Sequence, residues 1–200
     1  ALKNKLEIEG LFDADKKLSI PSSPKHIGIV TSSSTAAFQD IISTVQRRSP
    51  SSQVSISEAI VQGDNAHVSI INALNRIVLF NEINPENKID VVILSRGGGS
   101  IEDLWCFNNE DLAREIFSFP IPTISGVGHE IDFTVCDFVS DIRVPTPTAS
   151  AELVTEFNFR LQDKFNEFKT DIYKNINRLF SDLNQVTFIN IDLGGSVSSK

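Results

Sequence analysis

The chain has 200 residues, of which 40% are hydrophobic and 22% charged, values that exclude a disordered or fibrous protein and fit one globular domain with an appendage. No apolar run approaches the length of a membrane span. The formal net charge of −8 argues against a surface that grips nucleic acid by itself, because such domains usually carry a basic footprint.

The first 24 residues are polar and charged and end in Pro21-Ser22-Ser23-Pro24, a composition that predicts a linker. From residue 25 on, short apolar runs alternate with segments of helical spacing. Strands are predicted at residues 26–32, 54–61, 90–95 and 122–127, and helices at residues 36–48, 65–80 and 108–119. This alternation predicts an α/β domain over residues 25–147, with a mainly parallel sheet of four to five strands flanked by helices.

The pattern changes at Thr148. From there to about Val186, apolar residues recur every three or four positions, which predicts one long amphipathic helix or a helical hairpin over residues 148–186. Its length favours coiled-coil assembly, and a helix packed back on its own sheet is the alternative. Residues 187–200 are predicted to form a short strand at 188–191 and then a Gly/Ser tail.

In parallel sheets ligands bind beyond the carboxyl ends of the strands, so the residues that follow each strand are the first candidates for a site. The first strand runs into Thr31, Ser32 and Ser33 and then a helix. Hydroxyls and free N–H groups at a helix N-terminus favour an anion, although plain N-capping is the commoner use of such residues. Asp40 falls one to two turns into that helix, where its carboxylate can face the same edge.

The third strand runs into Arg96, Gly97, Gly98, Gly99 and Ser100. Consecutive glycines let the backbone approach a ligand and point its N–H groups at it, and an arginine offers a planar fork suited to phosphate. The combination indicates phosphate binding, with a flexible connection and a surface arginine as the alternative.

Four residues just beyond this turn allow more than one role. Glu102 and Asp103 either benefit from the dipole at the start of a helical turn or ligate a metal. Trp105 and Phe107 are able to stack on a base, but packing against the sheet is the expected role.

The fourth strand runs into a Gly-flanked turn that holds His129 and Asp132. A histidine at the carboxyl edge of a buried strand is well placed to exchange protons near neutral pH, and Asp132 either orients it or caps the next helix. His26 and His67 lack such a setting and are expected to be structural.

Asp137 and Asp141 lie four positions apart, shortly before Arg143. Acidic residues at this density leave a two-metal site open, but no compact zinc motif forms. The two cysteines, Cys106 and Cys136, are expected to be buried reduced thiols in a cytosolic protein.

Several distinctive strings occur together and in order. They are Pro24 to Asp40; Val61-Gln62-Gly63-x-x-Ala66; Arg96-Gly-Gly-Gly-Ser100-x-Glu-Asp-Leu-Trp105-x-Phe-Asn108; Gly128-His-Glu-x-Asp132; and Asp141-x-Arg143-x-Pro-Thr-Pro147-Thr-Ala. Over roughly residues 5 to 160 the chain thereby resembles the catalytic region of the exodeoxyribonuclease VII large subunit family. One departure falls in the first loop, where Thr35 stands in place of the glycine usual in the family.

The resemblance implies hydrolysis of single-stranded DNA from both ends into oligonucleotides, in the bacterial cytoplasm. It implies a small helical subunit as partner, bound through the helical segment 148–186, and no membrane. It further implies a strand-binding OB-fold domain before this segment, with residues 1–24 as the linker from it. The family is known for activity without an obligatory divalent metal, and Mg²⁺ remains an option.

The family pattern also points to Asp40, Arg96, His129 and Asp132 as active-site residues. Our hypothesis is that Arg96 and the glycine amides hold the scissile phosphate while His129 acts as general acid or base. In it Asp132 orients His129, and Asp40 positions water or a partner side chain. The expected substrate-binding residues are Thr31, Ser32, Ser33, Gly97, Gly98, Gly99, Ser100 and Arg143.

Two rival functions stay open from the sequence. One is a metal-dependent phosphohydrolase that uses Asp40, Glu102, Asp103 and Asp132 around magnesium. The other is a non-catalytic α/β module that holds a nucleotide or sugar phosphate.

Overall fold

The structure is a computed structural model that describes residues 2–97, 101–128 and 131–195. The segment at its start, predicted to be a linker, contains a helix, α1 (Leu2–Ile8), and a 3-10 turn, η1 (Ala14–Lys16). Leu6 and Leu11 are buried in the main hydrophobic cluster. These two leucines give an otherwise polar segment enough apolar surface to fold onto the domain.

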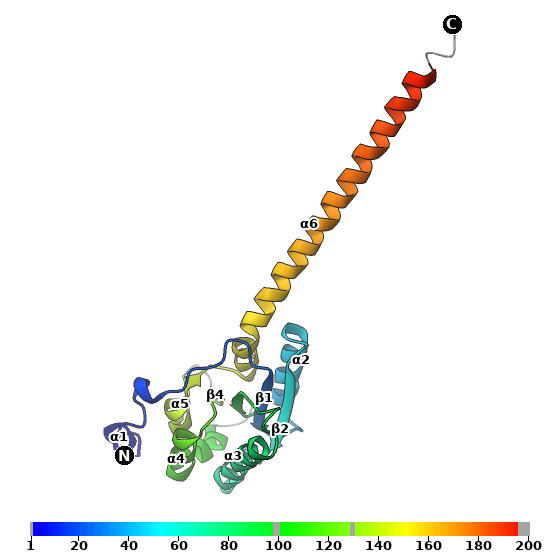
Figure 1. Cartoon of the computed structure of the whole chain (residues 1–200). Coiled ribbons are helices and arrows are strands. Elements are labelled where there is room, and N and C mark those ends of the chain that lie inside the picture. Colours follow the sequence, from blue (N-terminus) through cyan, green and yellow to red (C-terminus); the bar gives the residue numbers. More distant parts are fainter. Residues whose placement is uncertain (1, 98–100, 129–130, 196–200) are drawn as a thin grey trace. The chain divides into compact units, whose positions relative to one another are not determined.

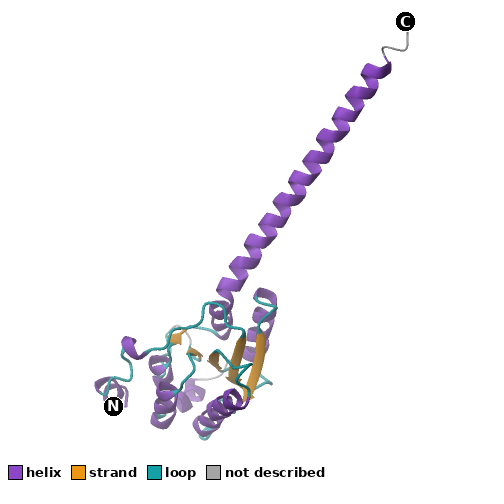
Figure 2. Ribbon diagram, in the orientation of Figure 1, coloured by secondary structure: helices purple, strands orange, loops and turns teal. Residues whose placement is uncertain are grey.

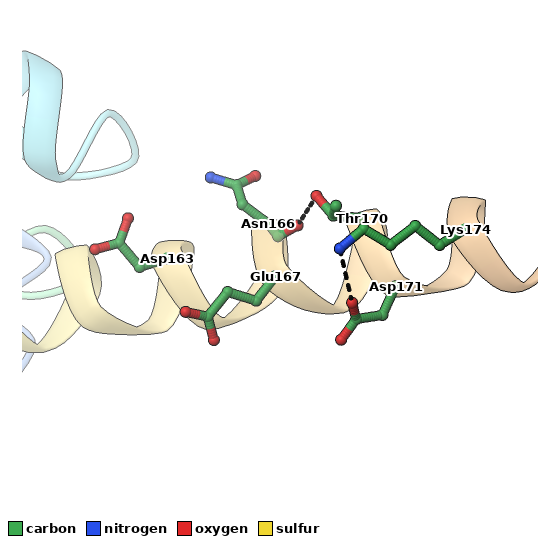
Figure 3. Close-up of a pocket in the computed structure, with 6 residues that line it drawn as sticks. All are labelled: Asp163, Asn166, Glu167, Thr170, Asp171 and Lys174. Atoms are coloured by element: carbon green, nitrogen blue, oxygen red, sulfur yellow. Dashed lines mark hydrogen bonds and ion pairs between the residues drawn. The ribbon is translucent and has the colours of Figure 1, made fainter.

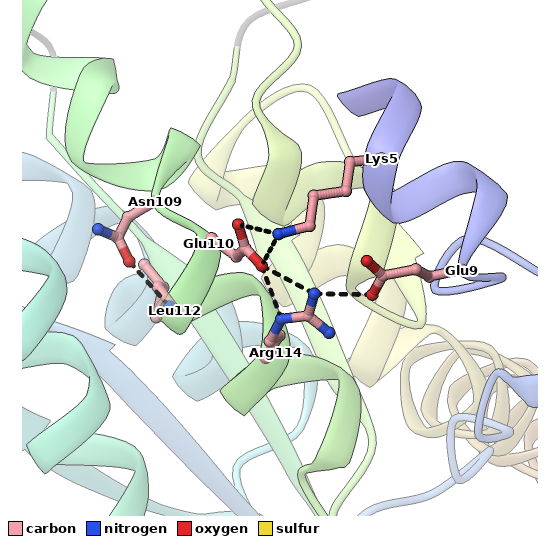
Figure 4. Close-up of polar contacts among 6 residues, drawn as sticks. All are labelled: Lys5, Glu9, Asn109, Glu110, Leu112 and Arg114. Atoms are coloured by element: carbon pink, nitrogen blue, oxygen red, sulfur yellow. Dashed lines mark hydrogen bonds and ion pairs between the residues drawn. The ribbon is translucent and has the colours of Figure 1, made fainter. Parts of the chain in front are cut away.

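Ion pairs join α1 to helix α4 (Glu110–Ser118), as Figure 4 shows. Lys5 Nζ lies 2.7 Å from Glu110 Oε1. Arg114 donates to that same oxygen and to Glu9 Oε2, each at 2.7 Å. Because these groups are exposed to water, they add specificity to the docking of α1 more than energy.

The centre of the domain is a five-stranded sheet in which every pairing is parallel. Its strands are β1 (His26–Thr31), β2 (Gln53–Glu58), β3 (Val91–Ser95), β4 (Thr123–Gly126) and β5 (Ile142–Arg143). The first four confirm the predicted strands to within a few residues. β5 was not located from the sequence, because two residues are too short a run to show a periodic pattern.

Helices cover both faces of the sheet, which confirms the predicted fold class (Figures 1 and 2). On one face, α3 (Ala66–Ile83), α4, α5 (Val135–Val139) and the 3-10 helix η2 (Ile101–Asn108) contribute to one core cluster. On the other face, α2 (Ala36–Arg48) packs with the first turns of α6 (Pro147–Gly195) in a second cluster.

The strand order is β2-β1-β3-β4-β5. The chain therefore moves outward from β1 to the edge strand β2 and then crosses back past β1 to β3. The gap between β1 and β3 is the topological switch point, where the connections leave in opposite directions and open a crevice at the carboxyl ends of the strands. The fold thus singles out the loops after β1 and β3 as the place for a ligand.

Helix α6 settles the choice between one helix and a hairpin, since it is continuous from Pro147 to Gly195. It replaces the strand predicted at 188–191, as extending an existing helix costs far less than nucleating a new element. The chain divides into two compact units, residues 1–158 and 159–200. In the described part of the chain, no helix is long and apolar enough to cross a bilayer.

Candidate active site

All five strands point the same way, so their last residues lie along one edge of the sheet. These residues are Thr31, Glu58, Ser95, Gly126 and Arg143. Three loops with predicted site residues leave from this edge, after β1, β3 and β4. This confirms the prediction that the ends of these strands lie along the same edge.

The loop after β1 is closed by its own hydroxyl groups. The Thr35 side chain accepts from Phe38 N at 3.3 Å and donates to the Ser32 carbonyl at 2.7 Å. Thr35 is thus the N-cap of α2, with an extended backbone that does not require glycine. The departure from the family's usual residue is accommodated here, and the commoner role of such a loop, N-capping, is confirmed.

Glu58 is a member of this edge that the sequence analysis missed. Ser33 N lies 3.1 Å from each carboxylate oxygen of Glu58. This backbone hydrogen bond lowers the pKa of Glu58 below its ordinary value of 4.5. The loop after β1 therefore already stabilises one anion. Its position could have indicated it in the sequence, because Glu58 is the last residue of β2, the strand that pairs with β1.

The loops after β1 and β3 meet at the switch point. A Cβ atom placed on Gly97 would lie 3.3 Å from the Thr35 Cβ, so the glycine lets the two backbones come together. Arg96, which precedes it, is only 4% exposed although it is a cation. Gly98, Gly99 and Ser100 lie outside the described residues.

Two hydroxyl groups lie buried directly beneath these loops. Thr31 ends β1 and Ser95 ends β3, the two strands that flank the switch point. Among the described residues, neither Thr31 Oγ1 nor Ser95 Oγ has a hydrogen-bond partner. A buried hydroxyl without a partner costs free energy, so a pair of them at a strand edge points to function rather than to stability.

The turn after β4 is organised by a buried carboxylate, that of Asp137. It accepts from Ser125 Oγ at 2.5 Å and from Thr134 N and Oγ1 at 2.8 and 2.9 Å. A Cβ on Gly128 would lie 2.0 Å from the Asp132 carbonyl oxygen and 2.9 Å from Asp137 Oδ2. The turn that holds Asp132 is therefore folded tightly over Asp137, while His129 lies outside the described residues.

The other predicted residues take different positions. Asp40 lies exposed on the second turn of α2, and Arg143 ends β5 with its guanidinium 3.9 Å from the centre of the Phe133 ring. Asp141 instead lies at the opposite edge of the sheet, where it accepts from Thr123 N at 2.7 Å and from Leu18 N at 2.6 Å.

The described residues favour structural roles for the acidic pair that had left a two-metal site open. Asp137 and Asp141 are both occupied by hydrogen bonds. Within residues 2–97, 101–128 and 131–195, no three His, Cys, Asp or Glu residues gather as metal ligands. The side chains of Glu102 and Asp103 lie outside this description.

Two structural predictions away from the edge are confirmed. The His26 ring is buried, with Nδ1 3.1 Å from the Asn87 carbonyl and Nε2 2.7 Å from Ser55 Oγ. Cys106 and Cys136 are both free and buried, and burial raises the pKa of the Cys136 thiol well above its ordinary value.

A hollow of about 360 Å³ opens at the carboxyl edge, between Ser32, Ser34 and Thr35 on one side and residues 58–62 on the other. A larger one, of about 490 Å³, lies along α6 and is shown in Figure 3. All six residues that line the latter belong to one helix, from Asp163 to Lys174. Only the former has the position expected of a ligand site in this fold.

The strand order defines a doubly wound α/β domain whose switch point lies between β1 and β3, with the close approach of Gly97 to Thr35 and the buried Arg96 beside it. The comparison with known proteins is specific. Residues 11–190 match the family model described as exonuclease VII, large subunit. The chain belongs to that family.

Relatives named exodeoxyribonuclease 7 large subunit occur in several bacteria. The one from Clostridium tetani is 46% identical over 189 residues, which cover 92% of this chain and 46% of the relative. The one from Vibrio parahaemolyticus is 52% identical over 157 residues, 78% of this chain and 34% of the relative. The one from Delftia acidovorans is 50% identical over 164 residues, which cover 78% of this chain and 37% of the relative. The chain thus spans about a third to a half of the length of these relatives.

Proposed function

We propose that the chain is the nuclease domain of an exodeoxyribonuclease that hydrolyses phosphodiester bonds of single-stranded DNA from either end and releases oligonucleotides. The observation that carries the proposal is the meeting of Thr35 and Gly97 at the switch point, beside an arginine that is buried at that edge. The names of the relatives support the reaction class.

In the proposed reaction Arg96 and the amides of the glycine turn bind the scissile phosphate and its developing negative charge. His129 transfers the proton as general acid or base, and Asp132 orients it. Asp40 positions the attacking water or a partner side chain. Thr31, Ser32, Ser33, Ser100 and Arg143 contact the strand along the same edge.

We propose no obligatory divalent metal, because an arginine and a histidine at the centre supply charge stabilisation and proton transfer by themselves. The rival reaction, with Mg²⁺ held by Asp40, Asp132 and the acidic residues after the glycine turn, differs in one measurable respect. It requires the metal in every turnover, so a chelator would abolish it.

The partner in this proposal is a small helical subunit that packs on α6. The support is a row of large apolar side chains that are more than half exposed on that helix: Leu161, Phe165, Phe168, Ile172, Leu179 and Leu183. Exposed apolar surface of this extent is typical of an interface. We expect coexpression with the small subunit to raise solubility, and charged substitutions at Phe165 and Phe168 to abolish that gain. The proposed compartment is the cytoplasm.

The experiment that tests the reaction is digestion of end-labelled single-stranded and duplex DNA by the full-length large subunit assembled with its small subunit. It is run with and without chelator, beside the His129→Ala variant. We expect oligonucleotide products from single strands both with and without chelator, and little product from duplex. The cleavage rate of the His129→Ala variant should be lower by roughly 10²–10⁴-fold. A variant as active as the wild type, or products that vanish in chelator, would contradict the proposal.

A further inference from the structure

We infer that Trp105 is a stacking platform for a nucleobase of the single strand, an inference that rests on the proposed function. The indole is 69% exposed, whereas its neighbours in η2 are buried: Leu104 is 5% and Phe107 1% exposed. Packing against the sheet, the role expected for both aromatic residues of this segment, is confirmed for Phe107 and wrong for Trp105. This exposure leaves a large, rigid aromatic face open to a ligand.

Three kinds of contact fix the backbone of η2 beside the indole. Leu104 and Phe107, three positions apart and therefore on the same side of a 3-10 helix, pack into the main core cluster. The Cys106 thiol donates to the Val61 carbonyl at 3.8 Å. Asn108 Oδ1 accepts from Val135 N at 2.9 Å. Because η2 is anchored in this way, its tryptophan is presented to a ligand at little conformational cost.

The anchors also place the indole at the active edge. Helix η2 begins directly after the glycine turn that follows Arg96. Trp105 and Asn108 are three positions apart, so they project from the same side of η2. On that side Asn108 meets the start of α5, three residues after Asp132. Trp105 therefore lies on an element that follows the connection after β3 in the chain and is hydrogen-bonded, through Asn108, to the helix that follows Asp132.

Stacking suits the substrate class. Each base of an unpaired strand exposes two π-faces, and an indole recognises any of them without reading the sequence. A duplex offers no such face along its length, because its bases already stack on one another. A phosphate held near Arg96 with an adjacent base on Trp105 would fix the strand by two unlike contacts, one electrostatic and one apolar.

The chain contains a single tryptophan, so its intrinsic fluorescence reports on Trp105 alone. The chain is titrated at low salt with a single-stranded oligonucleotide of about 12 residues carrying phosphorothioate linkages to slow cleavage. Fluorescence anisotropy of a dye on the strand measures binding in parallel. We expect saturable quenching that follows the anisotropy, and no quenching by an abasic strand of equal length. An unchanged emission throughout the titration would overturn the inference.

Variants give a second readout. Trp105→Ala is expected to weaken binding of the strand by roughly 5- to 150-fold and Trp105→Phe by less. The matched control is Leu79→Ala, which truncates another exposed apolar side chain, near the C-terminal end of α3. It should leave the affinity for the strand within about twofold of the wild type. Equal affinity of Trp105→Ala and wild type would again refute stacking. Lost cleavage with normal quenching would refute the proposed reaction alone, and normal cleavage with unaltered emission would refute stacking alone.

Discussion

The amino and carboxyl edges of the sheet differ in whether their polar side chains have hydrogen-bond partners. At the amino edge, carboxylates accept hydrogen bonds from backbone N–H groups: Asp90 accepts from Lys25 N and His26 N, and Asp141 accepts from Thr123 N and Leu18 N. At the carboxyl edge, the hydroxyls of Thr31 and Ser95 stay without partners among the described residues. Buried polar groups are usually paired, so these two hydroxyls set the carboxyl edge apart from the amino edge among the described residues.

The largest effect that tests this comparison uses one hydrogen-bonded carboxylate from each edge, the buried Asp137 and the partly buried Asp141. Asp137→Ala and Asp141→Ala each remove an acceptor of several hydrogen bonds, so both should lower the free energy of unfolding by about 2–3 kcal/mol. Only Asp137→Ala should also lower the cleavage rate, by about 10²-fold, because it frees the turn of Asp132.

Urea unfolding gives the stabilities, and the initial rate per folded molecule gives the activity. Equal loss of activity in both variants would remove the distinction between the edges. Asp137→Asn serves as a further check, since it keeps the shape of the side chain and replaces one acceptor by a donor.

An intermediate effect is expected from the two buried hydroxyls. Thr31→Val and Ser95→Ala remove groups that have no partner in the described structure, so the free energy of unfolding should stay constant or rise by about 1 kcal/mol. Binding of the strand should weaken by about tenfold if the hydroxyls face the substrate. Variants that lose stability while binding the strand normally would show that the hydroxyls serve the fold instead.

The smallest effect concerns the exposed network of Figure 4, whose residues have no role in the proposed chemistry. Hydrogen bonds from Lys5 and then from Arg114 lower the pKa of Glu110 below 4.5. The contribution of ionised Glu110 to stability is therefore complete above pH 4.5 and is lost as the pH falls through the folded-state pKa.

We expect Glu110→Gln to have a slightly lower thermal midpoint than wild type at pH 7, and the two midpoints to converge toward pH 3. Asp111→Asn, next to it on α4, is the control and should show no such convergence. Midpoints that differ equally at both pH values would contradict the ionic origin of the contact.

The sequence predicted the parts of this fold that follow from periodicity. Helix α2 has the predicted bounds, and the buried strand β3 agrees to within one residue. Local patterns miss what depends on contacts across the chain. The docking of Leu6, the pairing of the short β5 and the bond between Ser33 and Glu58 join residues that only the folded sheet brings together.

The same distinction between local patterns and long-range contacts applies to the candidate site. Each loop was found from its own composition, because glycine, hydroxyl and charged residues after an apolar run are visible locally. Which buried group lacks a partner, and which of Trp105 and Phe107 faces water, depend on the packing of η2 against α3 and α5. Such features become visible only in three dimensions.

The most direct test of the carboxyl edge as the cleavage site compares two arginines in the assembled full-length protein. Arg96 is buried at that edge, and Arg47 is exposed in the last turn of α2, which ends toward the amino edge. We expect Arg96→Ala to lower the rate of single-strand cleavage by about 10²–10³-fold without lowering the thermal midpoint enough to unfold the protein, and Arg47→Ala to cleave normally. Cleavage by Arg96→Ala at the wild-type rate would contradict a phosphodiester site between β1 and β3.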